Sequence, residues 1–441
     1  MAAMLAIYYL APWLRWDRGP NAPGQAILID FPERKFYFFF IEIWPQEVYF
    51  LTGILIMMAI GLFAVTASFG RIWCGYACPQ TVWTDLFIQV ERLIEGDRNA
   101  RMRLDAAPMS ASKLGKRALK YAVFLVISMA TGGAWVLYFA DAPTLAHQLV
   151  TFEAPYAAYA AVAFLTASTF VLGGLAREQV CTYMCPYARF QAAMLDEHSL
   201  IVAYRADRGE PRGKHKKGDS WEGHGDCVDC DSCVAVCPTG IDIRDGQQLE
   251  CINCGLCADA CDAVMDRVGR PRGLIGIDSL ANVTARKQGL PAATRIFRTR
   301  TLIYIGIWCA VGLFMLGTLL LRNDIDVNTL RDRNPLFVTL TDGSIRNGYT
   351  VHIINKQHAE RPLTLSVDGL PSARVNVLGD SGTAAGAKVT VPADGVGEFK
   401  VFVTAPRDSV KTESTGIHFI VREADGRVSA SRGSSFRGPS R

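Results

Sequence analysis

Four long apolar runs constrain this chain more than any other feature of its sequence. They cover roughly residues 47–69, 119–140, 157–175 and 301–321. Each approaches or exceeds the ~20 residues that a helix needs to cross a bilayer core. Buried helices of a large soluble protein are the alternative, but four such runs in one chain are hard to explain by chance. Residues 4–14 are too short to span alone, and form either an interfacial segment or the end of a first span. We therefore expect a membrane protein with about five spans.

The loops between these runs differ sharply in their content of lysine and arginine. Segment 70–118 carries eight such residues and segment 176–300 carries seventeen, whereas segment 141–156 carries none. An excess of Lys and Arg marks cytoplasmic loops. We therefore expect a multi-pass protein of the bacterial inner membrane, with both basic segments in the cytoplasm and the residues after the last span in the periplasm.

The cysteines are many and unevenly distributed. Twelve of the thirteen lie in residues 74–78 and 181–261, and the other, Cys309, lies in the last apolar run. A disulfide framework would scatter cysteines through a small secreted domain, whereas tight clusters in a larger chain indicate metal ligation. The net charge of +4 is too small to imply a nucleic-acid partner.

Two cysteine runs have the spacing of a bacterial ferredoxin. Residues 227–238 read CVDCDSCVAVCP, and residues 251–262 read CINCGLCADACD, with Asp262 in place of the proline. In such runs the fourth cysteine binds the other cluster. Zinc ribbons are the alternative, but zinc needs only four thiolates per site and does not explain this pattern appearing twice. We predict two [4Fe–4S] clusters, one bound by Cys227, Cys230, Cys233 and Cys261, and the other by Cys251, Cys254, Cys257 and Cys237.

A second repeat lies outside the ferredoxin runs. GRIWCGYACPQ (70–80) and REQVCTYMCPY (177–187) each follow an apolar run and contain C-x3-C-P. Cysteines at i and i+4 share one helix face, so two such helices side by side would present four convergent thiolates. Soft sulfur ligands select Cu(I), zinc or iron–sulfur centres, and the sequence does not choose among them. Simple packing is the alternative, with prolines that merely break helices. The four candidates are Cys74, Cys78, Cys181 and Cys185.

The residues after the last apolar run have the pattern of an all-β domain. Seven short runs between residues 335 and 423 alternate in polarity, and Gly, Pro, Asn or Asp punctuate most of the gaps. About seven strands in this length predict a sandwich of immunoglobulin type. We expect the tail, residues 431–441, to be disordered. His352, His358 and His418 are isolated, and we expect structural or solvated roles for them rather than ligation.

The predicted fold is a multi-domain membrane protein with an α-helical transmembrane bundle, an inserted 2[4Fe–4S] ferredoxin-like domain and a C-terminal immunoglobulin-like sandwich. The expected domains are residues 1–200 for the helical region with both C-x3-C-P elements, 201–295 for the cytoplasmic ferredoxin domain, 296–322 for the last span and 323–441 for the periplasmic sandwich.

The motifs RIWCGYACPQTVWTDLF, EQVCTYMCPYARFQAAMLD and CVAVCPTGIDIRDGQQLECINCGLCADACD, followed by the β-rich tail, stand in one order along the chain. In this the chain resembles the cytochrome c oxidase accessory protein family CcoG, also called FixG or RdxA, over nearly its whole length. The resemblance implies a role in assembling cbb3-type oxidase, in which Cu(II) is reduced to Cu(I) for transfer to a Cu(I) exporter. The C-x3-C-P thiolates would receive copper as catalytic residues, and the ferredoxin clusters would supply the electron.

The implied partners are the membrane, the copper ion, and oxidase-assembly factors or a Cu(I) exporter. The sequence does not identify the electron donor, and it leaves open whether the chain forms a homodimer. Two other hypotheses remain. A quinol-linked electron conduit to a partner complex would need no copper affinity at the C-x3-C-P elements. A non-enzymatic assembly scaffold would carry structural or sensory clusters and dock a partner through its β domain.

Overall fold

The structure is a computed structural model that describes residues 1–19, 22–215, 220–291, 293–379, 386–410 and 412–439. The chain divides into two compact units. The first consists of residues 1–15 and 25–315, and the second of residues 16–24 and 316–441. The first unit holds every cysteine of the predicted metal sites, so the site can be described within it.

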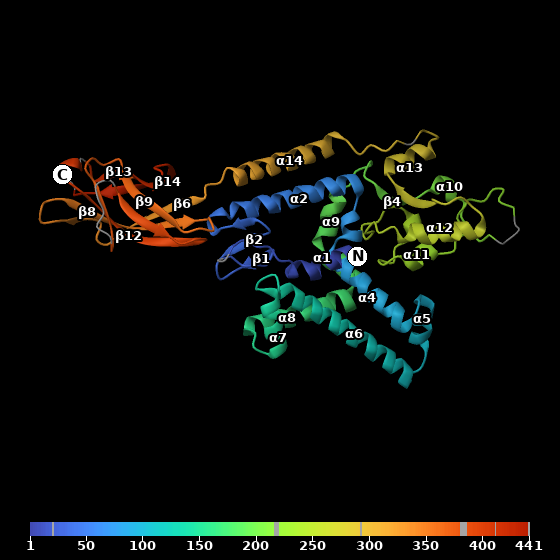
Figure 1. Ribbon diagram of the computed structural model, residues 1–441. Coiled ribbons are helices and arrows are strands. Elements are labelled where there is room, and N and C mark those ends of the chain that lie inside the picture. The colour runs from blue at the N-terminus through green and yellow to red at the C-terminus, as the bar shows by residue number, and fades with distance from the viewer. Residues whose placement is uncertain (20–21, 216–219, 292, 380–385, 411, 440–441) are drawn as a thin grey trace. The chain divides into compact units, whose positions relative to one another are not determined.

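Four helices in the described part of the chain are long and apolar enough to cross a membrane. They lie where the four apolar runs predicted them (Figure 1). Helix α1 (Ala2–Leu10) is also apolar but has only nine residues. The four spans are Pro45–Phe69, which ends in α2 (Tyr49–Phe69); α6 (Ala111–Val136); Tyr156–Ala176, formed by α8 (Tyr156–Ser168) and the π-helix η3 (Thr169–Ala176); and α14 (Thr299–Leu320).

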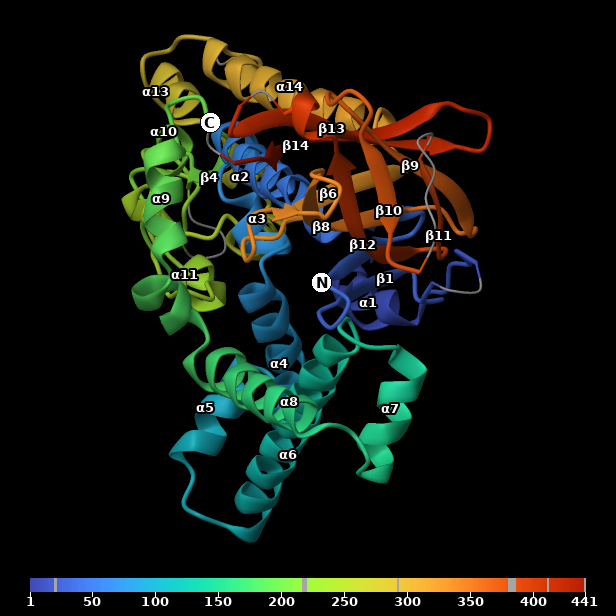
Figure 2. The ribbon, with the colours of Figure 1, turned by 90° about the vertical axis from the view of Figure 1, so that its left-hand side faces the viewer.

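The spans pack as two groups, which Figure 1 and Figure 2 show from perpendicular directions. Met315 and Trp308 of α14 lie against Gly53 and Gly61 of α2, where the small residues let the helices approach. In the other group α6 packs on α8, and α4 (Pro79–Glu95) packs on both α6 and η3.

Shorter elements complete the membrane-associated part of the first unit. A three-stranded antiparallel sheet precedes α2, and the sequence analysis did not foresee it. These elements are η1 (Ala11–Trp13), β1 (Ile27–Asp30), β2 (Lys35–Phe38), β3 (Ile41–Ile43), η2 (Pro45–Glu47), α3 (Ile72–Tyr76), α5 (Arg98–Ala106), α7 (Ala142–Thr151), η4 (Val180–Met184) and α9 (Pro186–Met194).

The ferredoxin module begins and ends on one antiparallel strand pair. Strand β4 (Ile201–Tyr204) pairs with β5 (Ile275–Asp278), with Ile201 opposite Asp278. Between them lie α10 (Ala206–Gly209), α11 (Ser232–Val236), η5 (Ile243–Asp245) and α12 (Leu256–Val268), and α13 (Leu280–Lys287) follows.

Asp262 has a structural role in place of the expected proline. Pro238 follows the short α11, whereas α12 continues past Cys261 to Val268, because Asp262 keeps its backbone N–H. The Asp262 carboxylate accepts a hydrogen bond from the N–H of Gly273 at 2.7 Å. The departure from the motif therefore lengthens the second helix and anchors the loop that leads into β5.

The second unit is a sandwich of two antiparallel sheets. One has the order β10-β12-β8-β6, with β7 also on β8, and the other has the order β11-β9-β13-β14. Inward-facing residues of both sheets form one core, in which Tyr349 and Phe419 make an edge-to-face contact at 5.0 Å. The strands are β6 (Ile325–Arg331), β7 (Val338–Thr339), β8 (Ile345–Asn355), β9 (Arg361–Asp368), β10 (Arg374–Val377), β11 (Ala387–Val391), β12 (Gly395–Ala405), β13 (Ser414–Glu423) and β14 (Val428–Arg437).

The prediction of a disordered tail was wrong for residues 431–437. They belong to β14, which pairs with β13, and Phe436 is fully buried in the core. Most residues of β14 are Ser, Arg or Gly, so the strand lacks the alternating pattern that marked the others. Tertiary pairing rather than local sequence preference makes this segment a strand.

A buried ion-pair network holds the helices beside the second C-x3-C-P element. Glu91 of α4 receives two hydrogen bonds from Arg177, one of them at 3.1 Å, and another from Arg101 at 2.5 Å. Lys120 of α6 bridges Glu91 at 3.4 Å and Glu95 at 2.9 Å. Burial alone would raise the pKa of Glu91, but the hydrogen bond to Arg177 and the three cations outweigh burial and lower it. The network joins α4, α5 and α6 to the end of η3.

We expect Glu91→Gln to lower the free energy of unfolding by about 1–3 kcal/mol at neutral pH, because it removes the buried carboxylate that pairs with Arg101 and Arg177, while Lys120 keeps its partner Glu95. The difference from wild type should begin to shrink as the pH falls through about 4.3, the usual pKa of an unfolded Glu, because the unfolded chain then takes up a proton, and it should vanish below the lower pKa of Glu91 in the folded protein. Unfolding in detergent as a function of pH checks this. Asp105→Asn is the matched control, because the Asp105–Arg117 pair is exposed and should contribute under about 1 kcal/mol. Equal stability of Glu91→Gln and wild type at pH 7 would refute the network's role.

Phe436→Ala should lower the stability of the sandwich by about 3–5 kcal/mol, the usual cost of truncating a buried aromatic side chain. Val428→Ala, on the same strand but 58% exposed, should have little effect. Limited proteolysis of the full chain, with cleavage sites in the second unit read by mass spectrometry, distinguishes the two variants. If both resist cleavage as well as wild type does, β14 is not part of the stable core.

Candidate metal centres

Both C-x3-C-P elements are helix breaks of the same geometry. Cys74 lies in the short α3, and Cys78 is the N-cap of α4, which starts at Pro79. Cys185 likewise caps α9, which starts at Pro186. The expectation that both cysteines of an element share one helix face was therefore wrong. The residue before a proline is driven to extended backbone, and a proline fits the first position of a new helix.

The two breaks share a backbone detail. The N–H of Cys78 donates to the carbonyl of Trp73 at 2.8 Å, and the N–H of Cys185 donates to the carbonyl of Val180 at 2.8 Å. In each case the bond reaches back five residues and closes a wide turn before the proline. The repeated spacing in the sequence therefore corresponds to a repeated local structure.

The structure brings the four cysteines of the two elements together. The thiols of Cys78, Cys181 and Cys185 all lie near enough to Cys74 for their charges to interact with it. Cys181 interacts in the same way with Cys78 and Cys185. We call this group, Cys74, Cys78, Cys181 and Cys185, the membrane-face quartet, because each of its elements directly follows a span.

Hydrogen bonds between the elements hold the quartet in place. Gln80 of α4 donates to the carbonyls of Leu172 at 2.8 Å and Arg177 at 3.1 Å, which tie it to the chain that leads into Cys181. Gln191 of α9 is fully buried and accepts a hydrogen bond from the thiol of Cys74 at 3.1 Å. Each element therefore contacts the helix of the other.

Burial controls the protonation of two quartet cysteines, Cys74 and Cys181. It raises the pKa of Cys74 to about 12, with a further contribution from the neighbouring thiols, and raises the pKa of Cys181 to about 11. Without a metal these two groups are thiols at neutral pH. A bound metal must displace their protons, because the thiolate is the ligand form.

Each predicted ferredoxin set lines one cavity. The first ferredoxin set (Cys227, Cys230, Cys233 and Cys261) surrounds a cavity closed by apolar side chains such as Met265 and Leu274. The second ferredoxin set (Cys237, Cys251, Cys254 and Cys257) lines another, beside Val202 and Ile241. The fourth cysteine of each run thus lies with the other run's first three, as the ferredoxin rule requires. That these residues ligate the clusters stays a prediction.

The surroundings of these cavities fit iron–sulfur clusters. Each cavity is lined by the four thiols of its set, and Cys233 also borders the second cavity. The N–H groups of Asn253 and Leu256 face the sulfurs of Cys251 and Cys254. Hydrogen bonds to the sulfurs and an apolar shell are the features by which a protein sets the potential of such a cluster. Burial raises the pKa of Cys257 and of Cys261 to about 12, so here too cluster binding must remove protons.

Arg71 lies between the quartet and the second ferredoxin set. It is 4% exposed, and its charge interacts with Cys74 and Cys185 on one side and with Cys251 on the other. Its guanidinium donates to the carbonyls of Leu249, Cys251 and Ala188. Burial lowers the pKa of Arg71, but an arginine keeps its charge at neutral pH. A buried cation therefore joins the two groups of thiols.

The backbones of the two centres also meet directly. A Cβ on Gly75 would lie 2.9 Å from the carbonyl oxygen of Ile252 and 3.2 Å from the Cα of Cys254, so only glycine fits. The hydroxyl of Tyr76 donates to the carbonyl of Cys254 at 3.0 Å. Beside this contact, a cavity of about 280 Å³ has both Cys181 and Cys254 in its lining.

Sequence reasoning missed the residues that join the centres. Arg71 counted only as a loop charge, although it stands three residues before Cys74 in the repeated element. Asn253 lies inside the second cysteine run, and its side chain accepts from Val202 N–H at 2.7 Å and donates to the carbonyl of Phe69 at 3.3 Å. The arginine within the motif was a signal that sequence inspection could have used. The role of Asn253 depends on folding and left no such signal.

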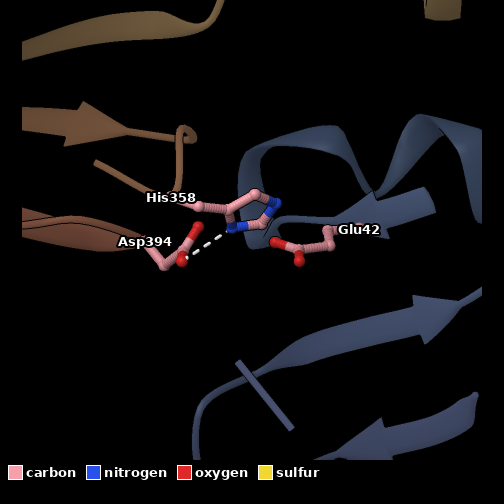
Figure 3. Close-up of side chains that lie close together, drawn as sticks. All are labelled: Glu42, His358 and Asp394. Atoms are coloured by element: carbon pink, nitrogen blue, oxygen red, sulfur yellow. Dashed lines mark hydrogen bonds and ion pairs between the residues drawn. The ribbon is translucent and has the colours of Figure 1, made fainter. Parts of the chain in front are cut away.

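The remaining candidates lie outside the quartet and both ferredoxin sets. Cys309 is exposed on α14. In the sandwich, His358 donates from Nδ1 to the Asp394 carboxylate at 2.8 Å (Figure 3), and His352 lies 3.7 Å from Glu398 on the neighbouring strand. That these histidines have structural or solvated roles stays a prediction.

Comparison with known families adds three matches. Residues 50–96 match a 4Fe-4S binding domain, and residues 176–280 match a 4Fe-4S dicluster domain. Residues 315–439 match the IG-like fold at the C-terminal of FixG. A solved structure titled as a FixG-related protein from Vibrio parahaemolyticus covers 27% of this chain and 100% of its own, at 22% identity and a TM-score of 0.23, which is too low to support an argument.

Curated relatives align with almost the whole chain. Nitrogen fixation protein FixG of Rhizobium meliloti is 52% identical over 96% of this chain and 86% of its own length. Proteins RdxA and RdxB of Cereibacter sphaeroides are 53% and 54% identical over 93% and 94% of this chain, and over 86% and 87% of their own lengths. The chain therefore belongs to the FixG and RdxA family, and it is an iron–sulfur electron-transfer protein of the membrane.

Proposed function

We propose that this protein delivers electrons from its ferredoxin module, through the membrane-face quartet, to Cu(II), and so supplies Cu(I) for the assembly of a cbb3-type oxidase. The observation that carries the proposal is the join between the centres, where Arg71, Gly75 and Tyr76 connect the quartet to the second ferredoxin set. Direct contact between the two centres favours electron transfer between them. A group of four thiols favours a metal that prefers soft ligands. The copper and oxidase parts of the proposal rest on the family resemblance.

The chemistry is a one-electron transfer. Bound [4Fe–4S] clusters supply reversible one-electron chemistry when the two ferredoxin sets are loaded. Each Cu(II) ion is a substrate that gains one electron and becomes Cu(I). Arg71 places a buried cation beside cysteines of both centres. Sulfur ligands nearby favour Cu(I) as the product.

In the proposed orientation the ferredoxin module and the quartet face the cytoplasm of the inner membrane. The basic loops support this arrangement, since segments 70–118 and 176–300 hold most of the Lys and Arg residues between the spans. Cu(I) would then be released on the side from which an exporter takes it. The sandwich would face the periplasm, where it could contact assembly factors.

A quinol-linked electron conduit is a second candidate, and one observation favours it. The cavity of about 280 Å³ beside Cys254 combines apolar residues such as Ile88 and Leu256 with the carboxylates of Asp85 and Glu178. A quinol needs an apolar pocket for its ring, a base for its protons and an electron acceptor within reach. On this hypothesis the quartet passes electrons onward and needs no copper affinity.

The first test measures Cu(I) production by the full-length protein in detergent. Clusters are reconstituted, reduced with dithionite and desalted, so that no free reductant remains. Stoichiometric Cu(II) is then added with a Cu(I) chelator, and both chromophores are followed. We expect the clusters to reoxidise as Cu(I) appears in wild type, and about tenfold or more slowly when the quartet cysteines are replaced by alanine, which corresponds to about 1.4 kcal/mol in the barrier.

Cys309→Ala is the matched control, because it removes a cysteine that lies outside the three groups of thiols. It should react as wild type does. If the quartet variant is as fast as wild type, copper is reduced elsewhere. If wild type makes no Cu(I) although its clusters are reduced, the reductase is wrong and the quinol-linked conduit becomes the better hypothesis.

Arg71→Gln should slow Cu(I) production by about tenfold while both ferredoxin clusters remain, since it removes charge-assisted hydrogen bonds worth about 1.5–3 kcal/mol each. Iron analysis and the visible absorbance check that the clusters are intact. Arg267→Gln, on the exposed side of α12, should leave the rate unchanged. A normal rate in Arg71→Gln would show that the buried cation does not matter for transfer.

A further inference from the structure

The spacing of the sulfur atoms in the quartet indicates which kind of metal centre the quartet can hold. No three cysteine sulfurs among the described residues, which include all thirteen cysteines, lie within 4.8 Å of one another. The quartet thiols are nevertheless near enough for their charges to interact. The four thiols are therefore neighbours, but no three of their sulfurs lie within 4.8 Å of one another.

A single metal ion does not suit this spread. With metal–sulfur bonds of about 2.3 Å, four thiolates around one tetrahedral ion would lie only about 3.8 Å apart. An iron–sulfur cube holds its thiolates farther apart, because each thiolate binds a different iron at a different corner. The quartet sulfurs do not have the close spacing of a single-ion site.

The ferredoxin sets provide a reference within the same molecule. Their cysteines lie in a 4Fe-4S dicluster domain, and among them too no three sulfurs lie within 4.8 Å of one another. In each ferredoxin set, as in the quartet, one thiol interacts electrostatically with the other three of its group. The quartet therefore resembles the cluster sites of this protein and not a mononuclear site.

One of the family matches contains too few cysteines to hold a cluster by itself, and the quartet supplies the missing ligands. The 4Fe-4S binding domain at residues 50–96 contains only two cysteines, Cys74 and Cys78. A cluster with four cysteine ligands needs two more. The dicluster match at residues 176–280 contains ten cysteines, of which eight form the ferredoxin sets. The two that remain are Cys181 and Cys185, which the structure places beside the first pair.

The electrostatics of the quartet also suit an anionic cluster. Cys78 and Cys185 stand at the N-termini of α4 and α9, where the helix dipole favours negative charge. Arg71 adds a buried positive charge beside Cys74 and Cys185. A cube with four thiolate ligands carries net negative charge, and these three features offset it without any exposed counter-ion.

We infer that the membrane-face quartet holds a third [4Fe–4S] cluster, ligated by Cys74, Cys78, Cys181 and Cys185. This deepens the proposed function and rests on its electron route, but not on its copper chemistry. Copper is then not a ligand partner of these thiolates, which revises the expectation from the sequence. Cu(II) accepts one electron from the reduced third cluster, which returns to its oxidised state, and no proton or bond is exchanged.

The experiment counts iron and acid-labile sulfide in full-length protein that is purified and reconstituted without oxygen. Wild type should contain about twelve of each per chain, against about eight if only the ferredoxin sets bind clusters. Copper and zinc are measured in the same samples. A wild-type value of about eight iron atoms, with or without one copper or zinc ion, overturns the inference.

Replacing Cys181 and Cys185 with serine tests whether the quartet binds the third cluster, and Cys309→Ser is the matched control. The control should keep about twelve iron atoms, and the variant should fall to about eight with the ferredoxin EPR signals unchanged. A variant that keeps about twelve overturns the assignment to the quartet.

A labelling experiment avoids dependence on the variant's folding. Wild type is treated with iodoacetamide before and after iron is removed by a chelator, and the labelled cysteines are mapped by mass spectrometry. The quartet should resist labelling while its iron is bound, and should be labelled once the iron has been removed and the chain has been unfolded in denaturant. Quartet cysteines that react fully before the iron is removed contradict the inference.

The outcomes separate this inference from the proposed function. Twelve iron atoms without Cu(I) production would keep the third cluster and reject the reductase. Eight iron atoms with Cu(I) production that depends on the quartet would keep the reductase and return the thiolates to direct copper binding.

Discussion

Pro79 and Pro186 each start a helix directly after a cysteine, and the arrangement of the metal centres depends on these two breaks. Without the proline, a helix would continue and carry both cysteines of an element past the site on one rigid face. The break instead turns the chain, caps the next helix with a cysteine and leaves the earlier cysteine on a separate turn. The same local feature, a helix that starts at a proline directly after a cysteine, thus occurs twice and brings together four thiols from two distant parts of the sequence.

A second constraint joins the ferredoxin module to the end of the spans. Asn253 and Arg71 each use a side chain from one part to satisfy backbone carbonyls of the other, so the join is made of hydrogen bonds rather than a large apolar surface. Buried carbonyls left without partners are costly, which makes this join specific in position. Gly75 completes it, because no larger residue lets the two backbones approach.

Most of the fold could be predicted from the sequence because the patterns that indicate it lie within short segments. Apolar length predicted the spans, and cysteine spacing predicted which thiols of the two ferredoxin runs lie together. Reasoning from local patterns failed at β14, where Phe436 is buried by pairing with β13 although its neighbours are polar. It also gave the wrong geometry for the C-x3-C-P elements, since helix periodicity was weighed above the rule that a proline restricts the residue before it. Asn253 shows the remaining limit, because nothing in the sequence reveals that its side chain hydrogen-bonds to Val202 and Phe69 after folding.

The pairing of β4 with β5 has a consequence for how this architecture could have arisen. Ile201 and Asp278 lie opposite each other, so the chain enters and leaves the ferredoxin module on two adjacent, paired strands. A segment with adjacent ends can be spliced into or out of a host without moving the helices on either side. Insertion of the ferredoxin module as one unit is thus compatible with the helices that bear the membrane-face quartet keeping their positions.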